Sequence, residues 1–515
     1  MDERGRHGST RVIIHAASLS LLITVIFVLS YAGPATVLGG ATFSPATNSP
    51  RAGLTPPALA TLADWPTYLQ NPSRTSANLA PTTLSSSNIK TVDTLWTYKT
   101  KATVSGTTNT ISASTAVVHN VAYFGSWDGY EYAVNASTGK LIWSSFLGVA
   151  KTKGCGNQGI ASSATVENGS LFVGGGDGNW YALNAATGTV EWSVLIGNPS
   201  EGYYNWASPL IFEGYAYIGV SSFCDDPLVP GGLLQVNLTT HVMQHFFATT
   251  SAGVLGSSVW GSPSIDAKTN TVYFATGNDY PHVTGPFADA VVAVSATNVS
   301  KLVSSWTIPP SQVITDGDFG STTTLFQTSG GTTLVGALDK NGYFYAFNAS
   351  NLAAGPLWRD HVTTGQGVGS AAFAQGLVYI ASGSINYKGT YSSGAAWALN
   401  PNNGVVAWEQ PLWGKSTGSA PAYANGLLLV DGGTHVFVLN ATTGMKIKEP
   451  SCGSADYSTP TIAENEILVG CSNGQEFALG IPPTKGSTAS PISALRAIGE
   501  SHLIVLVREG LPRWV

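Results

Sequence analysis

Charge is scarce in this sequence, and no part of the chain is strongly basic. Of its 515 residues only 10% are charged, and 23 Lys and Arg against 29 Asp and Glu leave a formal net charge of -6. Proteins that bind nucleic acid hold its phosphates with clustered Lys and Arg side chains. The sequence therefore argues against nucleic acid as a partner.

Motifs that identify several common chemistries are also missing. The chain contains no His-Glu-x-x-His zinc motif and no complete phosphate-binding loop, which argues against the enzyme classes that depend on them. It also lacks Cys-x-x-Cys-His, so no haem domain is attached. Glycine and tryptophan are plentiful instead, with 59 and 14 residues, and this composition is typical of a globular protein rich in turns.

The N-terminus has the pattern of an export signal. Three arginines precede an apolar run over 12–33, and small residues follow at 39–41, which is the order found in secretory signals. The run is also long enough to cross a bilayer, so residues 1–41 are interpreted as either a cleaved signal peptide or an uncleaved signal anchor. In both cases we expect an extracytoplasmic protein that meets the membrane only through that anchor.

One short segment recurs along the chain. Residues 132–143 read YAVNASTGKLIW, and residues 181–192 read YALNAATGTVEW. Related copies are YAFNASN from Tyr345, WALNPNNGVVAW ending at Trp408 and FVLNATTG from Phe437. Repetition of this kind indicates a fold built from many copies of one supersecondary unit.

Each copy predicts short strands joined by tight turns. In the second copy a strand over 179–184 is followed by a turn at 185–188 and a strand over 189–192. An Asn side chain before such a turn can bond the backbone two residues later, and the Gly after it tolerates positive φ. Short strands joined in this way predict antiparallel meanders. The turn asparagines are Asn135, Asn184, Asn348, Asn400 and Asn440.

The copies number eight when the outer turns are counted. A meander of four strands cannot bury both of its faces alone, whereas copies arranged radially cover one another. The last copy, over 467–479, lacks its outermost strand, and the segment TLWTYKT at 94–100 is a strand without a copy of its own. We therefore predict an all-β fold, an eight-bladed β-propeller of four-stranded antiparallel blades whose ring is closed by the N-terminal strand. The outer turns lie near Asn135, Asn184, Asn237, Ser295, Asn348, Asn400 and Asn440.

The predicted propeller occupies residues 62–480. Before it, residues 42–61 are mainly Pro, Ser, Thr and Ala without periodicity, a composition that predicts a flexible linker. After it, residues 481–515 form a C-terminal tail to which the sequence assigns no role.

The spacing Ala-x-Asn-x-x-Thr-Gly-x-x-x-Trp resembles the tryptophan-docking repeat of the quinoprotein dehydrogenases, eight-bladed propellers that bind pyrroloquinoline quinone. It is complete at 133–143 and 182–192 and nearly complete at 398–408. The opening segment 64–78 also resembles the lead-in of that family. We interpret the repeat tryptophans as packing between blades rather than as a site. They are Trp143, Trp192, Trp306, Trp358 and Trp408.

The resemblance also implies site residues. In that family a tryptophan lies under the quinone, a Glu and an Asn bind calcium, an Arg or Lys contacts the quinone oxygens, and an Asp is the base. VWGSPSID matches the first at Trp260, whose flat indole suits a planar cofactor. Thr-Gly-Asn places Asn278 at the calcium ion, and Asp226 aligns with the Glu; oxygen ligands suit this ion. Lys340, in the turn Asp-Lys-Asn-Gly, would stabilise the quinone oxygens.

Each of these residues also has a structural interpretation. Trp260 could pack between blades, Asp226 could belong to a solvated turn, and Lys340 could be an exposed hairpin lysine. The segment GCGNQG at 154–159 departs from the family's alcohol dehydrogenases, which carry two adjacent bridged cysteines followed by Asn-Arg-Gly. Gln158 stands in place of the arginine and is a candidate cofactor contact. The catalytic Asp is displaced as well, and the nearest acid, Asp289, is the candidate base.

The four cysteines of an exported chain are expected to pair. Three pairings are possible on paper. Cys452 and Cys471 lie within the last copy, and Cys155 and Cys224 lie on loops of adjacent blades at the channel side. We therefore predict disulfides between Cys155 and Cys224 and between Cys452 and Cys471.

These features favour an extracytoplasmic quinoprotein-type oxidoreductase. It would oxidise an alcohol, bulky or polymeric by the resemblance, with pyrroloquinoline quinone and Ca²⁺, and pass electrons to a separate acceptor such as a cytochrome c. The rival is a non-catalytic propeller scaffold that binds protein or polymer and has lost the cofactor. The retained Lys-Asn-Gly and Thr-Gly-Asn favour the enzyme, whereas the missing cysteine and arginine favour the scaffold.

Overall fold

The computed structural model describes residues 64–80, 82–101, 106–151, 155–280, 285–412, 418–454 and 458–482. All of them belong to one compact unit, 56–515. The predicted signal (1–41) and linker (42–61) and nearly all of the tail (481–515) lie outside the described residues. Within the described ranges, no helix combines the length and the apolar character that crossing a bilayer requires.

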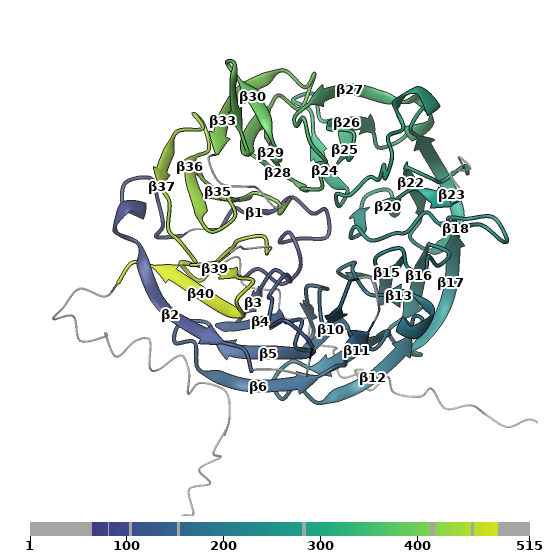
Figure 1. Ribbon diagram of the computed structural model, residues 1–515, viewed down its shortest axis with the longest axis horizontal. Coiled ribbons are helices and arrows are strands. Elements are labelled where there is room, and N and C mark those ends of the chain that lie inside the picture. Colours follow the sequence, from purple (N-terminus) through teal and green to yellow (C-terminus); the bar gives the residue numbers. More distant parts are fainter. Residues whose placement is uncertain are drawn as a thin grey trace, which may run out of the picture. The chain divides into compact units, whose positions relative to one another are not determined.

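Eight blades of four antiparallel strands surround a common axis, and a short fifth strand joins the sheet in two of them, which confirms the predicted β-propeller (Figure 1). In the first seven blades the chain runs from the innermost strand to the outermost. Blade one is β3 (Ala116–Val118), β4 (Val121–Gly125), β5 (Tyr130–Asn135) and β6 (Leu141–Phe146). Blade two is β9 (Thr165–Glu167), β10 (Ser170–Gly174), β11 (Asn179–Asn184) and β12 (Val190–Leu195). Blade three is β14 (Leu210–Phe212), β15 (Tyr215–Ser222), β16 (Gly232–Asn237) and β17 (Val242–Ala248).

The remaining blades follow the same plan. Blade four is β19 (Ser264–Asp266), β20 (Thr271–Ala275), β22 (Ala290–Ser295) and β23 (Asn298–Thr307). Blade five is β24 (Thr324–Gln327), β25 (Thr333–Leu338), β26 (Tyr343–Asn348) and β27 (Pro356–His361). Blade six is β28 (Ala371–Ala374), β29 (Leu377–Ser382), β32 (Gly394–Leu399) and β33 (Val406–Leu412). Blade seven is β34 (Ala422–Ala424), β35 (Leu427–Asp431), β36 (Val436–Asn440) and β37 (Lys446–Lys448).

Blade eight closes the ring as predicted. Its strands are β38 (Thr461–Ala463), β39 (Glu466–Gly470), β40 (Gln475–Gly480) and, from the start of the domain, β2 (Asp93–Lys99). β2 pairs antiparallel with β40, in a register that runs from Asp93 opposite Gly480 to Lys99 opposite Gln475. The N-terminal strand is therefore the outermost strand of the last blade, next to blade one (Figure 1).

The repeat tryptophans dock on the next blade, so their interpretation as packing residues is confirmed. The Trp143 indole Nε1 donates to the carbonyl of Ala185 at 2.9 Å, and Trp408 donates in the same way to Ala441 at 3.0 Å. The turn below Trp143 includes Gly188, which has a φ of +71° and so little space that a Cβ there would lie 2.5 Å from the ring. The Gly of the repeat therefore serves both the turn and the contact between blades.

A ring of hydroxyl groups joins the blades near the axis. In seven of the eight blades a Ser or Thr stands just before the innermost strand, whereas blade seven has Ala420 at this position. For most of these residues the backbone N–H donates to the hydroxyl of the next blade, as Ser114 does to Ser163 at 2.8 Å. The ring is irregular between blades six and seven, where the Ser419 hydroxyl has no partner among the described residues. The other members are Ser208, Ser262, Thr322, Ser370 and Thr459.

The lead-in segment 64–78 bonds to every blade. It runs across the middle of the ring and ends in β1 (Ala77–Asn78), which pairs in parallel with β34 (Figure 1). Within it, Arg74 is fully buried and donates to the carbonyl of Pro209 at 3.0 Å, just before the innermost strand of blade three. The other blades are reached through Val117, Val166, Ile265, Leu325, Phe373, Tyr423 and Ile462.

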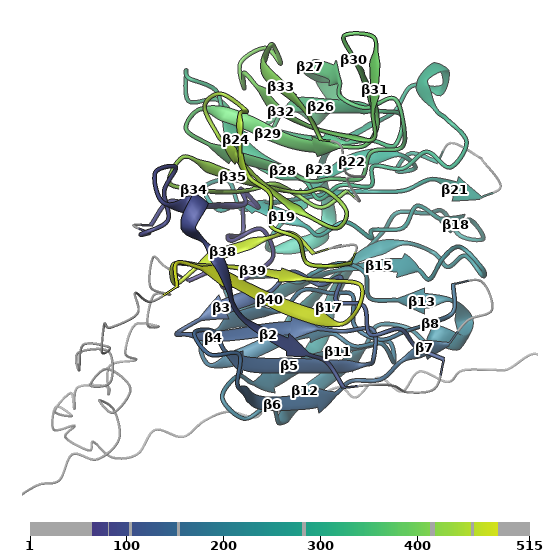
Figure 2. The same ribbon diagram turned by 60° about the vertical axis from the view of Figure 1, so that its left-hand side comes forward.

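Short additional elements depart from the repeat. Two-residue strands β7 (Ala150–Lys151) and β8 (Asn157–Gln158) pair, as do β18 (Leu255–Gly256) and β21 (Asp279–Tyr280), while β13 (Tyr203–Tyr204) pairs with β15. A hairpin of β30 (Ile385–Tyr387) and β31 (Thr390–Ser392) extends blade six. Figure 2 shows β7, β8, β13, β18 and β21 together on one side of the propeller. The described helices are short 3₁₀ turns, namely η1 (Ile89–Thr91), η2 (Pro199–Glu201), η3 (Pro310–Gln312) and η4 (Leu352–Ala354).

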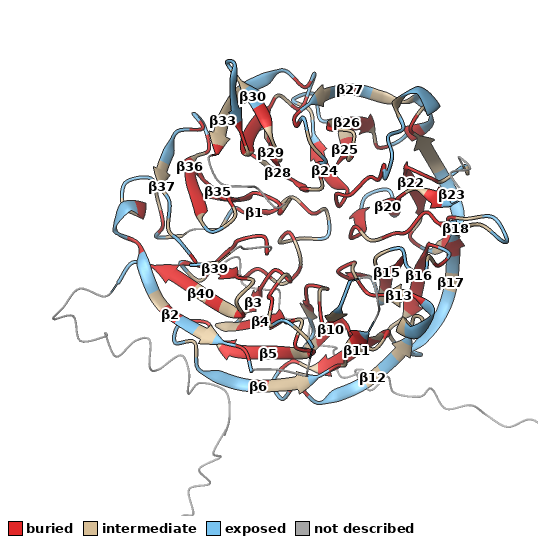
Figure 3. Cartoon of the chain, in the orientation of Figure 1, coloured by how far each residue is buried: buried red, intermediate tan, exposed pale blue. Residues whose placement is uncertain are grey.

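Burial follows the radial plan. The inner strands of each blade are buried, and the outermost strands are largely exposed (Figure 3). Apolar side chains from neighbouring blades form shared clusters, such as Trp143 and Tyr123 of blade one with Leu171 and Val173 of blade two. The packed blades form a scaffold, and the loops between strands are the places where a binding site can be built on it.

Candidate cofactor site

A cavity of about 260 Å³ lies where loops of three consecutive blades meet. Blade three contributes the loop between β15 and β16, and blade four the segments before β19 and after β20. Blade five contributes the segment before β24 and the turn between β25 and β26. All of these segments depart from the repeat, as expected for a site on a propeller. The cavity is lined by Trp206, Ser222, Cys224, Asp225, Ser258, Trp260, Asn278, Asp318 and Lys340.

Lys340 lies over the ring of Trp260. Its ammonium Nζ is 5.8 Å from the indole centroid, a distance at which a cation is attracted to an aromatic face. The turn that carries Lys340 is bonded to the segment that joins β23 to β24, because the Lys340 backbone N–H donates to the carbonyl of Asp318 at 2.8 Å. The side chain of Lys340 is only 14% exposed. It is therefore directed into the cavity rather than into solvent.

Asp318 is the buried acid of this cavity, and the sequence analysis did not identify it. One of its carboxylate oxygens accepts from Lys340 Nζ, and the other accepts from the backbone N–H of Asn278 at 2.9 Å. Burial raises the pKa of Asp318 to about 6, although the nearby Lys340 lowers it. Asp316, half exposed, is a second partner of Lys340 at 3.1 Å. A signal was present in the sequence, because Asp-Gly-Asp precedes the innermost strand of blade five much as Trp260 precedes that of blade four.

The predicted calcium ligands have different positions. Asn278 lines the cavity, and its side-chain amide makes no hydrogen bond with any described residue. Asp226 is not part of the lining, whereas its neighbour Asp225 is. Burial raises the pKa of Asp225, and the charge of Lys340 lowers it. The cavity thus brings the carboxylate of Asp225 and the amide of Asn278 together with Asp318, and the described chain holds no cluster of three or more His, Cys, Asp or Glu suited to a metal ion.

Asp289, the candidate base, stands just before β22 and outside the lining of the cavity. Its backbone N–H donates to the carbonyl of Gly277 at 3.0 Å, and its side chain is 4% exposed. One carboxylate oxygen of Asp289 has no partner among the described residues. Burial, with the nearby acids Asp339 and Asp318, raises the pKa of Asp289 to about 9. At neutral pH this carboxyl group is protonated and buried behind the cavity.

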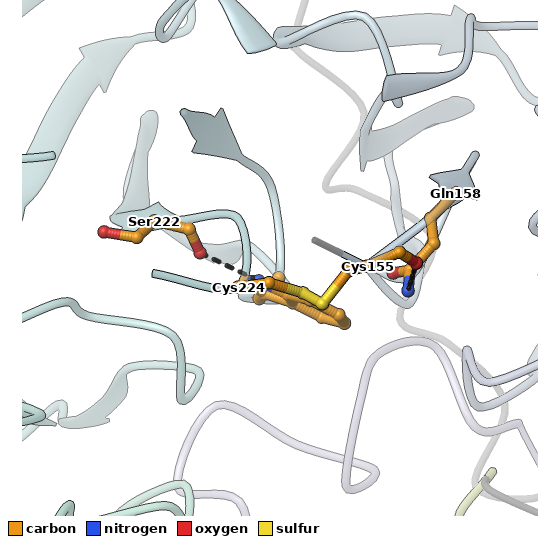
Figure 4. The surroundings of a disulfide bond; sticks show 5 residues. Cys155, Gln158, Ser222 and Cys224 are labelled. Carbon is orange, nitrogen blue, oxygen red and sulfur yellow. Dashed lines mark hydrogen bonds between the residues drawn. A yellow bond between two sulfur atoms is a disulfide. The ribbon is translucent and has the colours of Figure 1, made fainter. Parts of the chain in front are cut away.

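A disulfide joins Cys155 and Cys224 and forms part of the cavity wall (Figure 4). The two Cα atoms are 6.1 Å apart and the cysteines are 69 residues apart in the chain, so the bridge ties the loop before β8 to the loop after β15. Gln158 lies next to Cys155 and donates to its carbonyl at 3.5 Å. Only 7% of Gln158 is exposed, and it does not line the cavity.

The second predicted disulfide is absent from the structure, which corrects the sequence analysis. Cys452 and Cys471 are both buried thiols, and the thiol of Cys452 donates to the carbonyl of Ser454 at 2.8 Å. A hydrogen bond with Cys471 lowers the pKa of Cys452, while burial raises it. The two side chains are neighbours, as the meander predicts, but Cys452 satisfies its sulfur through a carbonyl and a thiol rather than through a covalent bond.

Tryptophans on the outer strands of six of the eight blades, with an indole, a lysine and a carboxylate in one cavity, define an eight-bladed propeller of the quinoprotein type. The family model described as outer membrane protein assembly factor BamB matches residues 67–202 and 340–488, more than half of the chain. The chain therefore belongs to this family, and its propeller is of the pyrroloquinoline quinone dehydrogenase type, as predicted.

Solved structures share the fold at low sequence identity. Quinohemoprotein alcohol dehydrogenase from Comamonas testosteroni matches with a TM-score of 0.68 and 17% identity, over 83% of this chain and 83% of that one. A europium-containing methanol dehydrogenase matches with a TM-score of 0.63 and 15% identity, over 81% and 98%. BamB from Moraxella catarrhalis matches with a TM-score of 0.51 and 15% identity, over 76% and 97%. A comparison with curated proteins found no match.

Proposed function

We propose that this protein is an extracytoplasmic quinoprotein oxidoreductase that oxidises an alcohol with pyrroloquinoline quinone and passes the electrons to a separate acceptor such as a cytochrome c. The observation that supports this most strongly is that Trp260, Lys340 and Asp318 share one cavity. They offer a flat apolar surface, a cation and a proton acceptor. Alcohol dehydrogenases of the quinohemoprotein kind have the same fold.

The lining of the cavity fits a planar, anionic, oxygen-rich cofactor. Trp260 would stack against its rings, and Lys340 would donate hydrogen bonds to its oxygens. The disulfide through Cys224 would add an apolar wall. When bound, the quinone would accept the hydride, which carries the electron pair, from an alcohol that becomes a carbonyl compound, and the hydroxyl proton would go to a base. Gln158 does not line the cavity, so we do not include it among the proposed contacts.

Asp318 rather than Asp289 is the proposed general base. A base must be ionised to take the proton of the alcohol O–H group, and it works best when its pKa lies near the working pH. The pKa of Asp318 is about 6, and that of Asp289 is raised to about 9. Asp318 also lines the cavity, and its bonds to Lys340 and to the Asn278 N–H hold the carboxylate in place.

Asp225 and Asn278 are the proposed protein ligands of a hard cation such as Ca²⁺. Carboxylate and amide oxygens are the ligands that this ion prefers. The Asn278 amide makes no hydrogen bond with the described chain, and burial raises the pKa of Asp225, so a cation here would stabilise both groups. Asp225 takes the role that the sequence analysis gave to Asp226, because it lines the cavity.

The alternative is a propeller scaffold without a cofactor. The family model carries the description of outer membrane protein assembly factor BamB, and BamB from Moraxella catarrhalis has the same fold. A scaffold of this kind would keep the docked tryptophans, since they hold the blades together, but it would have no need for a lysine and a buried acid over an indole face. It predicts that the protein binds no quinone.

Equilibrium dialysis of purified protein against pyrroloquinoline quinone with Ca²⁺ distinguishes the oxidoreductase from the scaffold. The wild type should bind the quinone, and Trp260→Ala or Lys340→Ala should weaken binding by about 1 to 3 kcal/mol. Lys388→Ala is the matched control, because Lys388 lies over a tyrosine ring at 4.9 Å in the exposed β30–β31 hairpin. Dye reduction with a panel of alcohols then tests the reaction. Affinity that is unchanged in both cavity variants would refute the assigned site.

A further inference from the structure

A second cavity adjoins the first. It has a volume of about 370 Å³ and is lined by Asp225, Leu228, Leu255, Asn278 and Tyr280. Asp225 and Asn278 also line the first cavity. The two cavities therefore share a wall, and a molecule in the second would have one end beside the residues of the first.

Backbone hydrogen bonds hold the walls of the second cavity in place. Leu255 pairs with Tyr280 across the β18–β21 ribbon, which projects on the same side of the propeller as β13 (Figure 2). The Gly256 N–H donates to the carbonyl of Val229 at 3.0 Å, which ties this ribbon to the β15–β16 loop. The Ser257 N–H donates to the carbonyl of Asn278 at 2.6 Å. The β15–β16 loop and the segments that carry β18 and β21 are therefore hydrogen-bonded to one another and form one continuous surface.

The lining of this cavity is mostly apolar. Leu255 is 37% exposed and Tyr280 is 55% exposed, and Leu228 is half-buried beside them. Most other exposed large apolar side chains of the propeller belong to outer strands, whereas these three gather next to a polar cavity. Apolar side chains that converge with a few polar groups are typical of small-molecule sites.

The polar groups of the second cavity limit the ligand further. Among the described residues of the lining, Asp225 is the one charged side chain, so an anionic ligand would be repelled from the calcium-free protein. A polyol would place several hydroxyl groups against leucine side chains without partners, which is unfavourable.

We propose that the second cavity binds the apolar body of a neutral alcohol, such as an aryl or alkyl alcohol, with its hydroxyl group directed to the wall shared by Asp225 and Asn278. The inference rests on the proposed function, since it assigns the substrate of the same site. Leu255 and Tyr280 are then specificity residues. They select against small alcohols, polyols and hydroxy acids, because these lack an apolar body or carry groups that the lining cannot satisfy.

Ligand binding to the protein without quinone tests this inference separately from the reaction. Saturation-transfer NMR would compare benzyl alcohol with glycerol and benzoate. We expect signal from benzyl alcohol alone, and at least about fivefold weaker binding in Leu255→Ser and in Tyr280→Ser. Tyr391→Ser is the matched control, since Tyr391 is a 68% exposed tyrosine of the other short ribbon, β30–β31. Circular dichroism would verify that each variant folds.

The outcomes distinguish the inference from the function on which it rests. If benzyl alcohol binds through Leu255 and Tyr280 but no quinone binds, the proposed function fails and the apolar ligand site stands. If quinone-dependent oxidation occurs while benzyl alcohol and glycerol are bound equally well, or both cavity variants bind benzyl alcohol like the control, the inference is overturned. In quinone-loaded enzyme, the ratio of kcat/KM for benzyl alcohol to that for glycerol should fall at least about fivefold in Leu255→Ser.

Discussion

Replacing Lys340 with Met should destabilise the folded protein far more at pH 8 than at pH 5. Lys340 Nζ lies 3.1 Å from Asp316 and bonds Asp318, whose side chain is only 10% exposed. Methionine keeps most of the length and the apolar stem of lysine, so this substitution removes the cation with little loss of packing. The protein then holds a buried carboxyl group without its ion-pair partner.

The size and the sign of this effect follow from the titration of Asp318. Burial already raises the pKa of Asp318 to about 6 with Lys340 present, above the value of about 3.9 in an unfolded chain. A group with a raised folded-state pKa loses stability as the pH rises through that value. Removing a cation this close raises the pKa of a carboxyl group by about 1 to 3, or roughly 1.5 to 4 kcal/mol. The variant should therefore lose about 1 to 3 kcal/mol relative to the wild type at pH 8, and little at pH 5, where Asp318 is mostly protonated in both.

Urea unfolding followed by tryptophan fluorescence at pH 5, 6, 7 and 8 measures this difference. The control is Lys388→Met, which removes an exposed lysine of the β30–β31 hairpin and should change the free energy of unfolding by less than about 0.5 kcal/mol at every pH. A cost of Lys340→Met that is the same at pH 5 and pH 8 would show that Asp318 does not depend on Lys340 for its charge. Equal costs in the two lysine variants would refute the electrostatic reasoning altogether.

Three further predictions concern packing, metal binding and cysteines. Gly188→Ala should cost about 3 kcal/mol of unfolding free energy in chemical denaturation, because a Cβ would meet the docked indole as well as a positive φ, whereas Gly169→Ala, at φ +83° with open space around it, should cost about 1 to 2 kcal/mol. Calcium should raise Tm in differential scanning fluorimetry of the wild type but not of Asp225→Asn. Equal rises in Tm in both proteins would show that Asp225 does not bind the ion. Non-reducing peptide mapping should recover Cys155 linked to Cys224 and two alkylated thiols per denatured chain; a second bridge would contradict the structure.

The propeller could be predicted because its signals are local. The turn at Asn184 depends on residues within one copy of the repeat, and Trp143 docks on the turn of the copy that follows it in the sequence. The same residue types recur from copy to copy, so the pattern can be recognised in the sequence. Counting copies then showed that the last blade lacked a strand. The pairing of β2 with β40 follows, because an unpaired strand edge in a closed ring has one remaining partner.

The site could be predicted only in part. Trp260, Asn278 and Lys340 each lie in a short motif next to a strand, and the structure places all three in the lining of one cavity, while their roles stay predictions. Asp225 rather than the predicted Asp226 lines the cavity, and the long insertion between β15 and β16 has no repeat spacing that could fix the alignment. Asp318 was not predicted, because its contact with Lys340 joins two loops of blade five that are 22 residues apart in the chain.

By itself, the sequence determined the number of blades, the strand order and the packing of the repeat tryptophans, because periodic local signals specify these features. Tertiary structure alone decided which acids line the cavity beside Trp260, where the second cavity opens, and which cysteines form a disulfide. It also showed that the lead-in reaches all eight blades and that a ring of hydroxyl groups joins them. These features depend on distances between segments far apart in the chain, and such distances exist only after the blades have packed into a ring.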